Sequence, residues 1–424
     1  MKHERISPQN KNTAKNICLV FLTALSIYQI SQLWLVESIS HNFFYANLNH
    51  IVEPHNDYFK RPTRILTNLG ELGGNRFNVL YETLDSNILD ILNNIFDEVL
   101  SNGELVSMHD TIEKNNLLQN SNIIWEYSFN VPARILSVPI GLDYFDSVVF
   151  VPSTAASNLV YMFFVDNARD KAAQFNLVSL RNRDILNALI QASYREIADF
   201  HYASSLIMGF DFDKNIFLPM WRGNTFSFYD VIMQNSFVDQ PNIRANITSF
   251  FENPNAVWGS RRYGVYIFGD ANQVVRYFDN DTLEFVSHRQ GLSPLGLEAD
   301  FDIAVSFINR DPLVVNDFYL TRFEEDYNKR VFYFDYIVEN FPIILSESFK
   351  AKTGLNHALE VTVENGIVTR YRKIAHNFIV SDNVSEIREN AITLVNNMED
   401  ITPNDIRFGY VVTPAGVNLE WKVE

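Results

Sequence analysis

The sequence predicts an α+β protein, with a single N-terminal transmembrane helix followed by an extracytoplasmic part of about three mixed α+β domains. Three observations lead to this class. An uncharged apolar stretch lies close to the N-terminus, and basic residues flank it closely on only one side. After it, runs with the periods of strands and of helices mix without the regular βαβ order of a nucleotide-binding fold. A hairpin followed by a helix also occurs twice, which indicates that the last two domains are copies of one unit.

The first element is the stretch from Asn16 to Val36, NICLVFLTALSIYQISQLWLV. A helix of about 20 residues spans about 30 Å, the hydrocarbon thickness of a bilayer. Four Lys and Arg residues precede the stretch and none follows before Lys60, so we expect the N-terminus in the cytoplasm and the bulk of the chain outside. A cleavable signal peptide and a buried soluble helix are the alternatives, although no small-x-small cleavage site follows.

Polar residues interrupt this membrane helix. Ser26, Gln29 and Gln32 are spaced by three residues and spread over about 120° of the helix. In hydrocarbon, such side chains form hydrogen bonds with neighbouring helices, worth about 0.6 to 2 kcal/mol each. They are our predicted contacts with another membrane helix. The alternative is a weakly hydrophobic anchor whose polar groups bond to their own backbone.

The composition excludes several classes of function. The chain of 424 residues has a formal net charge of -17 and no cluster of Lys and Arg, whereas a nucleic-acid partner requires a basic face. The single cysteine, Cys18, lies inside the predicted membrane helix. Disulfides, a cysteine nucleophile and a cysteine-ligated zinc are therefore excluded from the exterior part.

The segments follow from this order. We predict a cytoplasmic tail at 1–15, the transmembrane helix at 16–36, a linker at 37–62, and extracytoplasmic α+β domains at 63–212, 213–312 and 313–424.

In the first exterior domain, Arg76–Thr83 alternates apolar and polar residues as a strand does. Ser86–Leu100 places its apolar residues on one helical face, with Ser86 as cap and Gly103 as stop. We predict a second long helix at Asp184–Ser204. The β-rich runs are Ile123–Val131, Ser147–Val151 and Leu159–Val165.

The two later domains each contain a predicted hairpin and helix. Val274–Phe278 pairs with Leu283–Ser287, and a helix follows at Leu297–Asn309. In the third domain, Leu359–Val363 pairs with Ile367–Arg372 across Asn365-Gly366, a hairpin signal. The other expected elements are a helix at Asn242–Glu252, strands at Gly264–Phe268, Arg330–Val338 and Phe341–Leu345, and a helix at Ser385–Met398.

No catalytic motif accompanies these elements. GxGxxG, P-loop, GxSxG and HExxH are absent, and the nine His are scattered. The glycines of Leu69–Asn75 predict a loop rather than a phosphate cradle, and Asp279-Asn280-Asp281 lacks the rest of a calcium loop. Carboxylate pairs, Asp211 with Asp213 and Glu324 with its neighbours, are what remains for acid–base chemistry. We therefore predict no catalytic, cofactor-binding or metal-binding residue.

Several stretches resemble the YycH family. Phe250–Val257 (FFENPNAV) and Arg261–Asp270 (RRYGVYIFGD) resemble its central signature. Ile65–Asn68 with the strand at Arg76 resembles its opening, and Leu419–Val423 resembles its ending.

The resemblance implies a single-span protein whose exterior part has three α+β domains, the last two alike and similar to the companion protein YycI. It also implies that the protein is not an enzyme. Members join YycI and the WalK/YycG sensor kinase through membrane helices and exterior surfaces, and so adjust cell-wall turnover. One departure is Val257–Ser260, which stands where the family has an Arg soon after Asn253-Pro254.

Two hypotheses follow. The first is a membrane-anchored regulator, single-pass in the cell membrane, that modulates a two-component sensor histidine kinase together with a YycI-like companion. The alternative is an extracytoplasmic protein that binds envelope polymers or peptides, or an atypical hydrolase that uses acidic pairs. A hydrolase requires a concave pocket with convergent carboxylates of raised pKa.

Overall fold

The computed structural model describes most of the chain after residue 61. The predicted tail, the transmembrane helix and all but the last residue of the linker lie outside the described residues. Among the described helices, none is both long enough and apolar enough to cross a membrane. The described ranges are 62–70, 77–81, 86–109, 114–136, 138–153, 157–195, 200–205, 207–208, 217–221, 223, 225–236, 243–251, 253–291, 293–339, 341–396 and 406–423.

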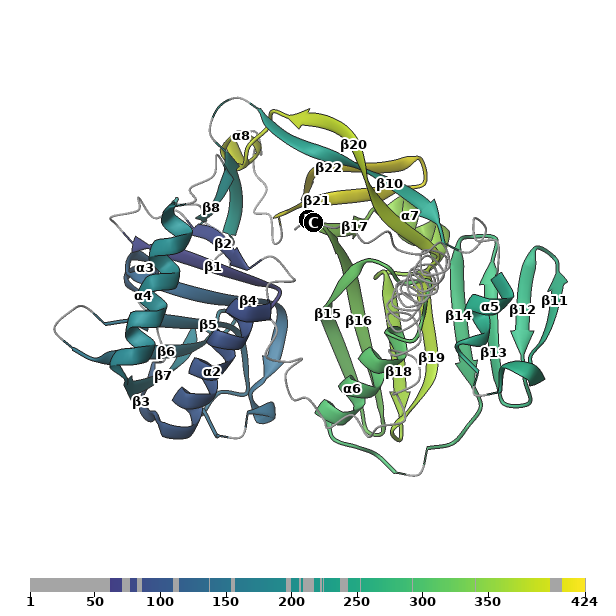
Figure 1. Ribbon diagram of the computed structural model, residues 1–424, viewed down its shortest axis with the longest axis horizontal. Coiled ribbons are helices and arrows are strands. Elements are labelled where there is room, and N and C mark those ends of the chain that lie inside the picture. Colours follow the sequence, from purple (N-terminus) through teal and green to yellow (C-terminus); the bar gives the residue numbers. More distant parts are fainter. Residues whose placement is uncertain are drawn as a thin grey trace, which may run out of the picture. The chain divides into compact units, whose positions relative to one another are not determined.

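The first part of the described chain is a nine-stranded sheet with helices against one face (Figure 1). α2 (Ser86–Asn102) and α4 (Leu180–Arg195) contribute Phe96 and Ile190 to a core cluster centred on the buried Trp125. The strand order is β3-β7-β6-β5-β4-β1-β2-β8-β9. The strands are β1 (Arg64–Leu69), β2 (Phe77–Tyr81), β3 (Glu104–His109), β4 (Ser121–Pro132), β5 (Tyr144–Pro152), β6 (Leu159–Asp166), β7 (Lys171–Val178), β8 (Phe200–Ser204) and β9 (Phe217–Trp221), with a short helix α3 (Lys114–Gln119) and a 3-10 turn η2 (Ala133–Ile135).

Most predicted elements of this part are confirmed. α2 begins at Ser86 as expected, and the Gly103 amide donates to the Val99 carbonyl at 2.8 Å where the helix ends. The helix predicted at Asp184–Ser204 is wrong in its second half. α4 begins at Leu180 and ends at Arg195, and the residues from Phe200 pair with β9 as strand β8.

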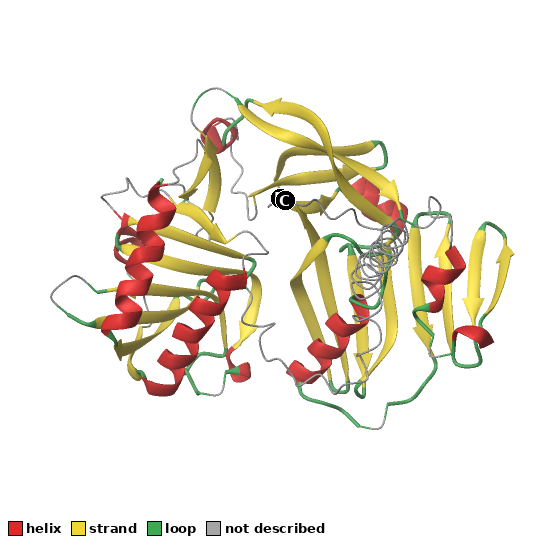
Figure 2. Cartoon of the chain, viewed as in Figure 1, coloured by secondary structure: helices red, strands yellow, loops and turns green. Residues whose placement is uncertain are grey.

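The second part contains an eleven-stranded sheet (Figure 2). Its main order is β11-β12-β13-β14-β19-β18-β16-β17-β21-β22, and β15 pairs with β16. The strands are β11 (Trp258–Arg262), β12 (Val265–Gly269), β13 (Gln273–Phe278), β14 (Thr282–Ser287), β15 (Asp317–Asp326), β16 (Lys329–Val338), β17 (Phe341–Leu345), β18 (Leu359–Glu364), β19 (Ile367–Ile374), β21 (Ile406–Thr413) and β22 (Gly416–Val423). The helices are α5 (Ile243–Thr248), α6 (Leu297–Ile308), α7 (Glu347–Thr353) and α8 (Ala391–Asn396), with a 3-10 turn η3 (Pro254–Ala256).

Both predicted hairpins are confirmed. β13 pairs with β14, and β18 pairs with β19 across Asn365 and Gly366, whose φ angles of 51° and 79° match the turn that an Asn-Gly pair favours. β14 pairs with β19, so the two hairpins lie side by side in one sheet. The domain boundaries and the duplication stay predictions.

Two predicted helices in this part need correction. The helix predicted at Asn242–Glu252 is the shorter α5. The helix predicted at Ser385–Met398 is wrong at its start, because Ser385 belongs to strand β20 (His376–Ile387) and pairs with Phe228. Only α8 is helical there among the described residues.

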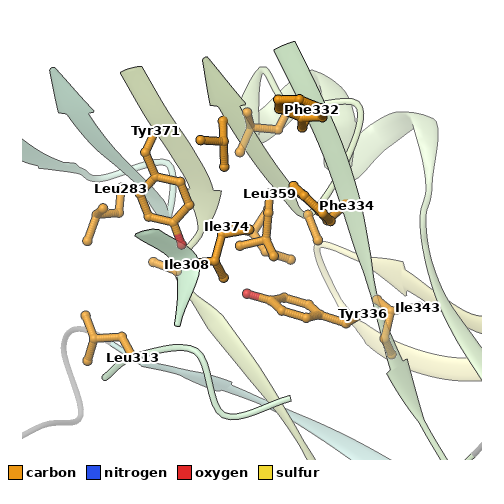
Figure 3. Packing of buried hydrophobic residues seen from close by; sticks show 14 of the residues in the cluster. Leu283, Ile308, Leu313, Phe332, Phe334, Tyr336, Ile343, Leu359, Tyr371 and Ile374 are labelled. Atoms are coloured by element: carbon orange, nitrogen blue, oxygen red, sulfur yellow. The ribbon is translucent and has the colours of Figure 1, made fainter. Parts of the chain in front are cut away.

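The core of the second part encloses a charged pair among tyrosines. Figure 3 shows Tyr336 and Tyr371 lying among aliphatic side chains such as Leu359. Asp311 accepts a hydrogen bond from the Tyr371 hydroxyl at 3.0 Å and forms an ion pair with Lys373 at 2.8 Å. Both charged side chains are almost fully buried. Burial lowers the pKa of Lys373, and the Asp311 carboxylate opposes that shift without reversing it.

Candidate interaction surface

Two strands that are distant in sequence form a separate two-stranded ribbon. β10 (Phe226–Asn235, FSFYDVIMQN) pairs antiparallel with β20 (HNFIVSDNVSEI), from Phe226 opposite Ile387 to Asn235 opposite His376. Figure 1 shows the two strands running side by side. An isolated two-stranded ribbon is only marginally stable, so this one depends on what its inner face contacts.

The inner face is held by aromatic side chains. Phe226 stacks on Trp221 with ring centroids 5.6 Å apart, and Phe228 meets Tyr410 edge-on at 6.4 Å. The Tyr410 hydroxyl donates to the backbone carbonyl of Tyr229 at 2.8 Å. Aromatic pairs of this kind add about 0.5 to 1.5 kcal/mol each beyond their buried area. The ribbon is therefore fixed to the core by one face.

The ribbon carries several exposed apolar side chains, and four of them form the group that we call the outer ribbon face: Tyr229, Ile232, Ile379 and Val384. They are 50%, 55%, 46% and 58% exposed respectively. Ile232 lies directly opposite Ile379, and Tyr229 directly opposite Val384. Residues opposite each other in an antiparallel pair share one face of the sheet, so the four form two exposed cross-strand pairs, one on each side of the register shift between Tyr229 and Val231.

The grouping of these exposed apolar side chains indicates a site of contact with another molecule. Single exposed hydrophobic residues are ordinary, whereas a contiguous exposed apolar surface marks a site that contacts another molecule. A rigid strand pair also presents its side chains without further ordering cost, which favours binding. The outer ribbon face therefore suits a protein–protein contact.

Of the other site residues considered in the sequence, some lie outside the described residues and some are described. Ser26, Gln29 and Gln32 lie outside the described residues and stay predictions. Asp211 and Asp213 also lie outside them. Glu324 accepts hydrogen bonds from the Arg322 guanidinium and from the Tyr333 hydroxyl, the latter at 3.1 Å.

Glu325, beside Glu324, is also held by cations. Arg330 donates to it at 2.7 and 3.0 Å, and Arg134 pairs with its other oxygen. Burial raises the pKa of Glu325, but the hydrogen bonds from Arg330 and Arg134 outweigh it and the pKa is lowered. A general acid would need the opposite shift. Within the described ranges, no group of three His, Cys, Asp or Glu could hold a metal ion.

Sequence reasoning missed the outer ribbon face. One signal was present, because Phe226-Ser227-Phe228 alternates as a strand does. Ile232 does not continue that alternation, since the pairing register shifts between Tyr229 and Val231, and Tyr229 is apolar at a position where the alternation predicts a polar residue. Such a shift places apolar residues on both faces, which a period of two does not reveal.

The fold and this surface define a mixed α+β protein, mostly sheet, with an exposed apolar ribbon and no metal cluster among its described residues. Among solved structures, the chain is similar to YycH from Bacillus subtilis, with a TM-score of 0.55 and 12% sequence identity over 86% of this chain and 94% of that chain. The YycH-like fold that the resemblance implied is thereby confirmed. No family model and no curated protein matches the sequence.

Proposed function

We propose that this chain is a membrane-anchored regulator that modulates a two-component sensor histidine kinase, and through it cell-wall metabolism. The outer ribbon face is the observation that carries the proposal, because it offers a rigid apolar surface on a YycH-like fold. The kinase or a YycI-like companion is the proposed partner. The predicted anchor supports the same role, since Gln29 and Gln32 could pair with a partner's membrane helix.

Regulation of this kind requires no chemistry. A regulator acts by binding one state of the kinase more tightly than the other, and a preference of about 1.4 kcal/mol shifts the equilibrium tenfold. Burying the exposed parts of four apolar side chains would provide about 4 kcal/mol in total, at about 1 kcal/mol for each half-exposed side chain. The outer ribbon face is therefore large enough to supply such a preference.

The test uses the full-length chain in its own membrane with the kinase and its target-gene reporter. Ile232→Ser combined with Ile379→Ser should reduce co-purification with the kinase complex and change reporter output. Val178→Ser is the matched control, because Val178 is 78% exposed but lies at the end of β7. A second arm replaces Asn16–Val36 by an unrelated membrane helix. If neither change altered binding or reporter output, the proposal would be refuted.

A further inference from the structure

The end of the eleven-stranded sheet is a strand edge, whereas the outer ribbon face is a group of exposed apolar side chains. β11 is the terminal strand, and among the described residues it pairs with β12 alone. The backbone groups on its other side have no partner strand there. An edge of this kind can accept an additional strand from another molecule.

The hairpin Trp258–Gly269 (WGSRRYGVYIFG), which we call the edge hairpin, is basic and aromatic. It contains two Arg and no Asp or Glu, in a chain whose net charge is -17. Trp258 is 50% exposed and Tyr263 is 100% exposed. Arg261 lies over the Tyr266 ring at 4.6 Å, and Arg262 is exposed with no ion-pair partner among the described residues.

The geometry of the edge hairpin is fixed by its own residues. Tyr263 and Gly264 have φ angles of 52° and 84°, so the two-residue turn places a tyrosine at a left-handed position that such a residue rarely adopts. The Trp258 ring lies against Gly269 and the Phe268 ring against Gly259, so that a Cβ at Gly269 would fall 2.8 Å from the indole. Aromatic rings packed on cross-strand glycines hold the register of an edge.

We propose that the edge hairpin binds an extended acidic segment of a partner protein by adding it as a strand beside β11. Backbone hydrogen bonds along β11 would supply the pairing, and alternating side chains would supply the selectivity. Arg261 and Arg262 are consecutive, so they lie on opposite faces of the sheet and favour carboxylates on both faces of the added strand. Trp258 shares a face with Arg262 and favours an apolar residue there.

Charge selects this occupant over a second copy of the chain. Two edge hairpins in one ladder would bring four guanidinium groups together without a carboxylate from either strand, which is unfavourable. Edge arginines also discourage unwanted pairing. Preventing unwanted pairing would require only the arginines, and not the exposed Trp258 and Tyr263 beside them.

The test measures binding of a labelled peptide of about eight residues to the full-length chain in detergent by fluorescence anisotropy. In this peptide, pairs of Glu alternate with pairs of Val, so that both faces of the strand carry carboxylates and apolar side chains. Arg261→Glu with Arg262→Glu should weaken binding at least about tenfold, and Trp258→Ser should also weaken it. Arg310→Glu, which makes the charge change of one of these two substitutions at an exposed site outside the edge hairpin, should change affinity less than about twofold. A further edge variant is Tyr263→Ser. Its control is Tyr327→Ser, because Tyr327 is also an exposed residue of positive φ in a hairpin turn.

Three results would overturn the proposal. The first is equal binding by the edge variants and their controls, and the second is equal binding of a peptide with Lys in place of Glu. The third is concentration-dependent dimerisation that the arginine variants abolish, which would assign the edge to a second copy. Thermal melting of each variant establishes that it is folded, and Arg262→Gln provides a milder variant. Kinase output is not part of this test, so its result is independent of the proposed function.

Discussion

The exposed fractions of Ile232 and Ile379 in the outer ribbon face predict how much affinity a partner would lose when both are replaced. Ile232 and Ile379 are 55% and 46% exposed, and full burial of an isoleucine side chain contributes about 1.5 to 3 kcal/mol. A partner that covers the exposed half of each would gain about 0.8 to 1.5 kcal/mol per residue. Ile232→Ser with Ile379→Ser should therefore weaken binding by about 1.5 to 3 kcal/mol, which is about 10- to 150-fold in Kd.

The same substitutions should have little effect on folding. Both side chains point away from the core, so the free energy of unfolding should change by less than about 1 kcal/mol per site, the range of strand propensity. Affinity is measured between the full-length chain and the purified kinase complex in detergent, and stability by urea unfolding. A loss of stability larger than the loss of affinity would refute the reasoning. Unchanged affinity in a folded variant would refute it equally.

Three further predictions concern the stability of the described part of the chain. In the Asp311–Lys373 pair, Asp311→Asn or Lys373→Met alone should lower the free energy of unfolding by about 3 to 5 kcal/mol, because a lone buried charge costs more than a neutral pair. The double variant should recover most of this loss, as measured by urea unfolding. Burial raises the pKa of Asp146 to about 6, so its contribution to stability is complete below about pH 4 and is lost as pH rises to about 6. The stability difference between Asp146→Asn and wild type should shift in favour of the variant by up to about 3 kcal/mol across that window, measured by urea unfolding at pH 4 and pH 7. Replacing Gly354, which ends α7 at φ 67°, by Ala should lower the free energy of unfolding by about 1 kcal/mol, which is measured as a lower Tm.

Local signals in the sequence predicted much of the fold. Asn365-Gly366 specifies its hairpin because both residues tolerate positive φ, and α2 follows from a cap at Ser86 and a continuous apolar face. These features depend on neighbours in sequence. They could be read without knowing what the segments contact.

The incorrect predictions involve long-range pairing. Ser385 lies in a segment with helical period, yet it pairs with Phe228 as a strand. The residues from Phe200 were predicted as helix and pair with β9 instead. In both, tertiary contacts outweigh a weak local preference. The outer ribbon face escaped prediction for a related reason, because exposure of Ile232 depends on which face of β10 the core covers.

Photocrosslinking in intact membranes tests whether the outer ribbon face contacts the sensor kinase or its companion protein. A p-benzoylphenylalanine replaces Ile232 in the full-length chain, and a second sample carries it at Val178, which is more exposed, at 78% against 55%, and lies outside the ribbon. The proposed function predicts a crosslink from position 232 to the sensor kinase or to its companion protein, and none from position 178. A folded, membrane-located chain that gives no crosslink at 232, or the same products at both positions, would contradict it.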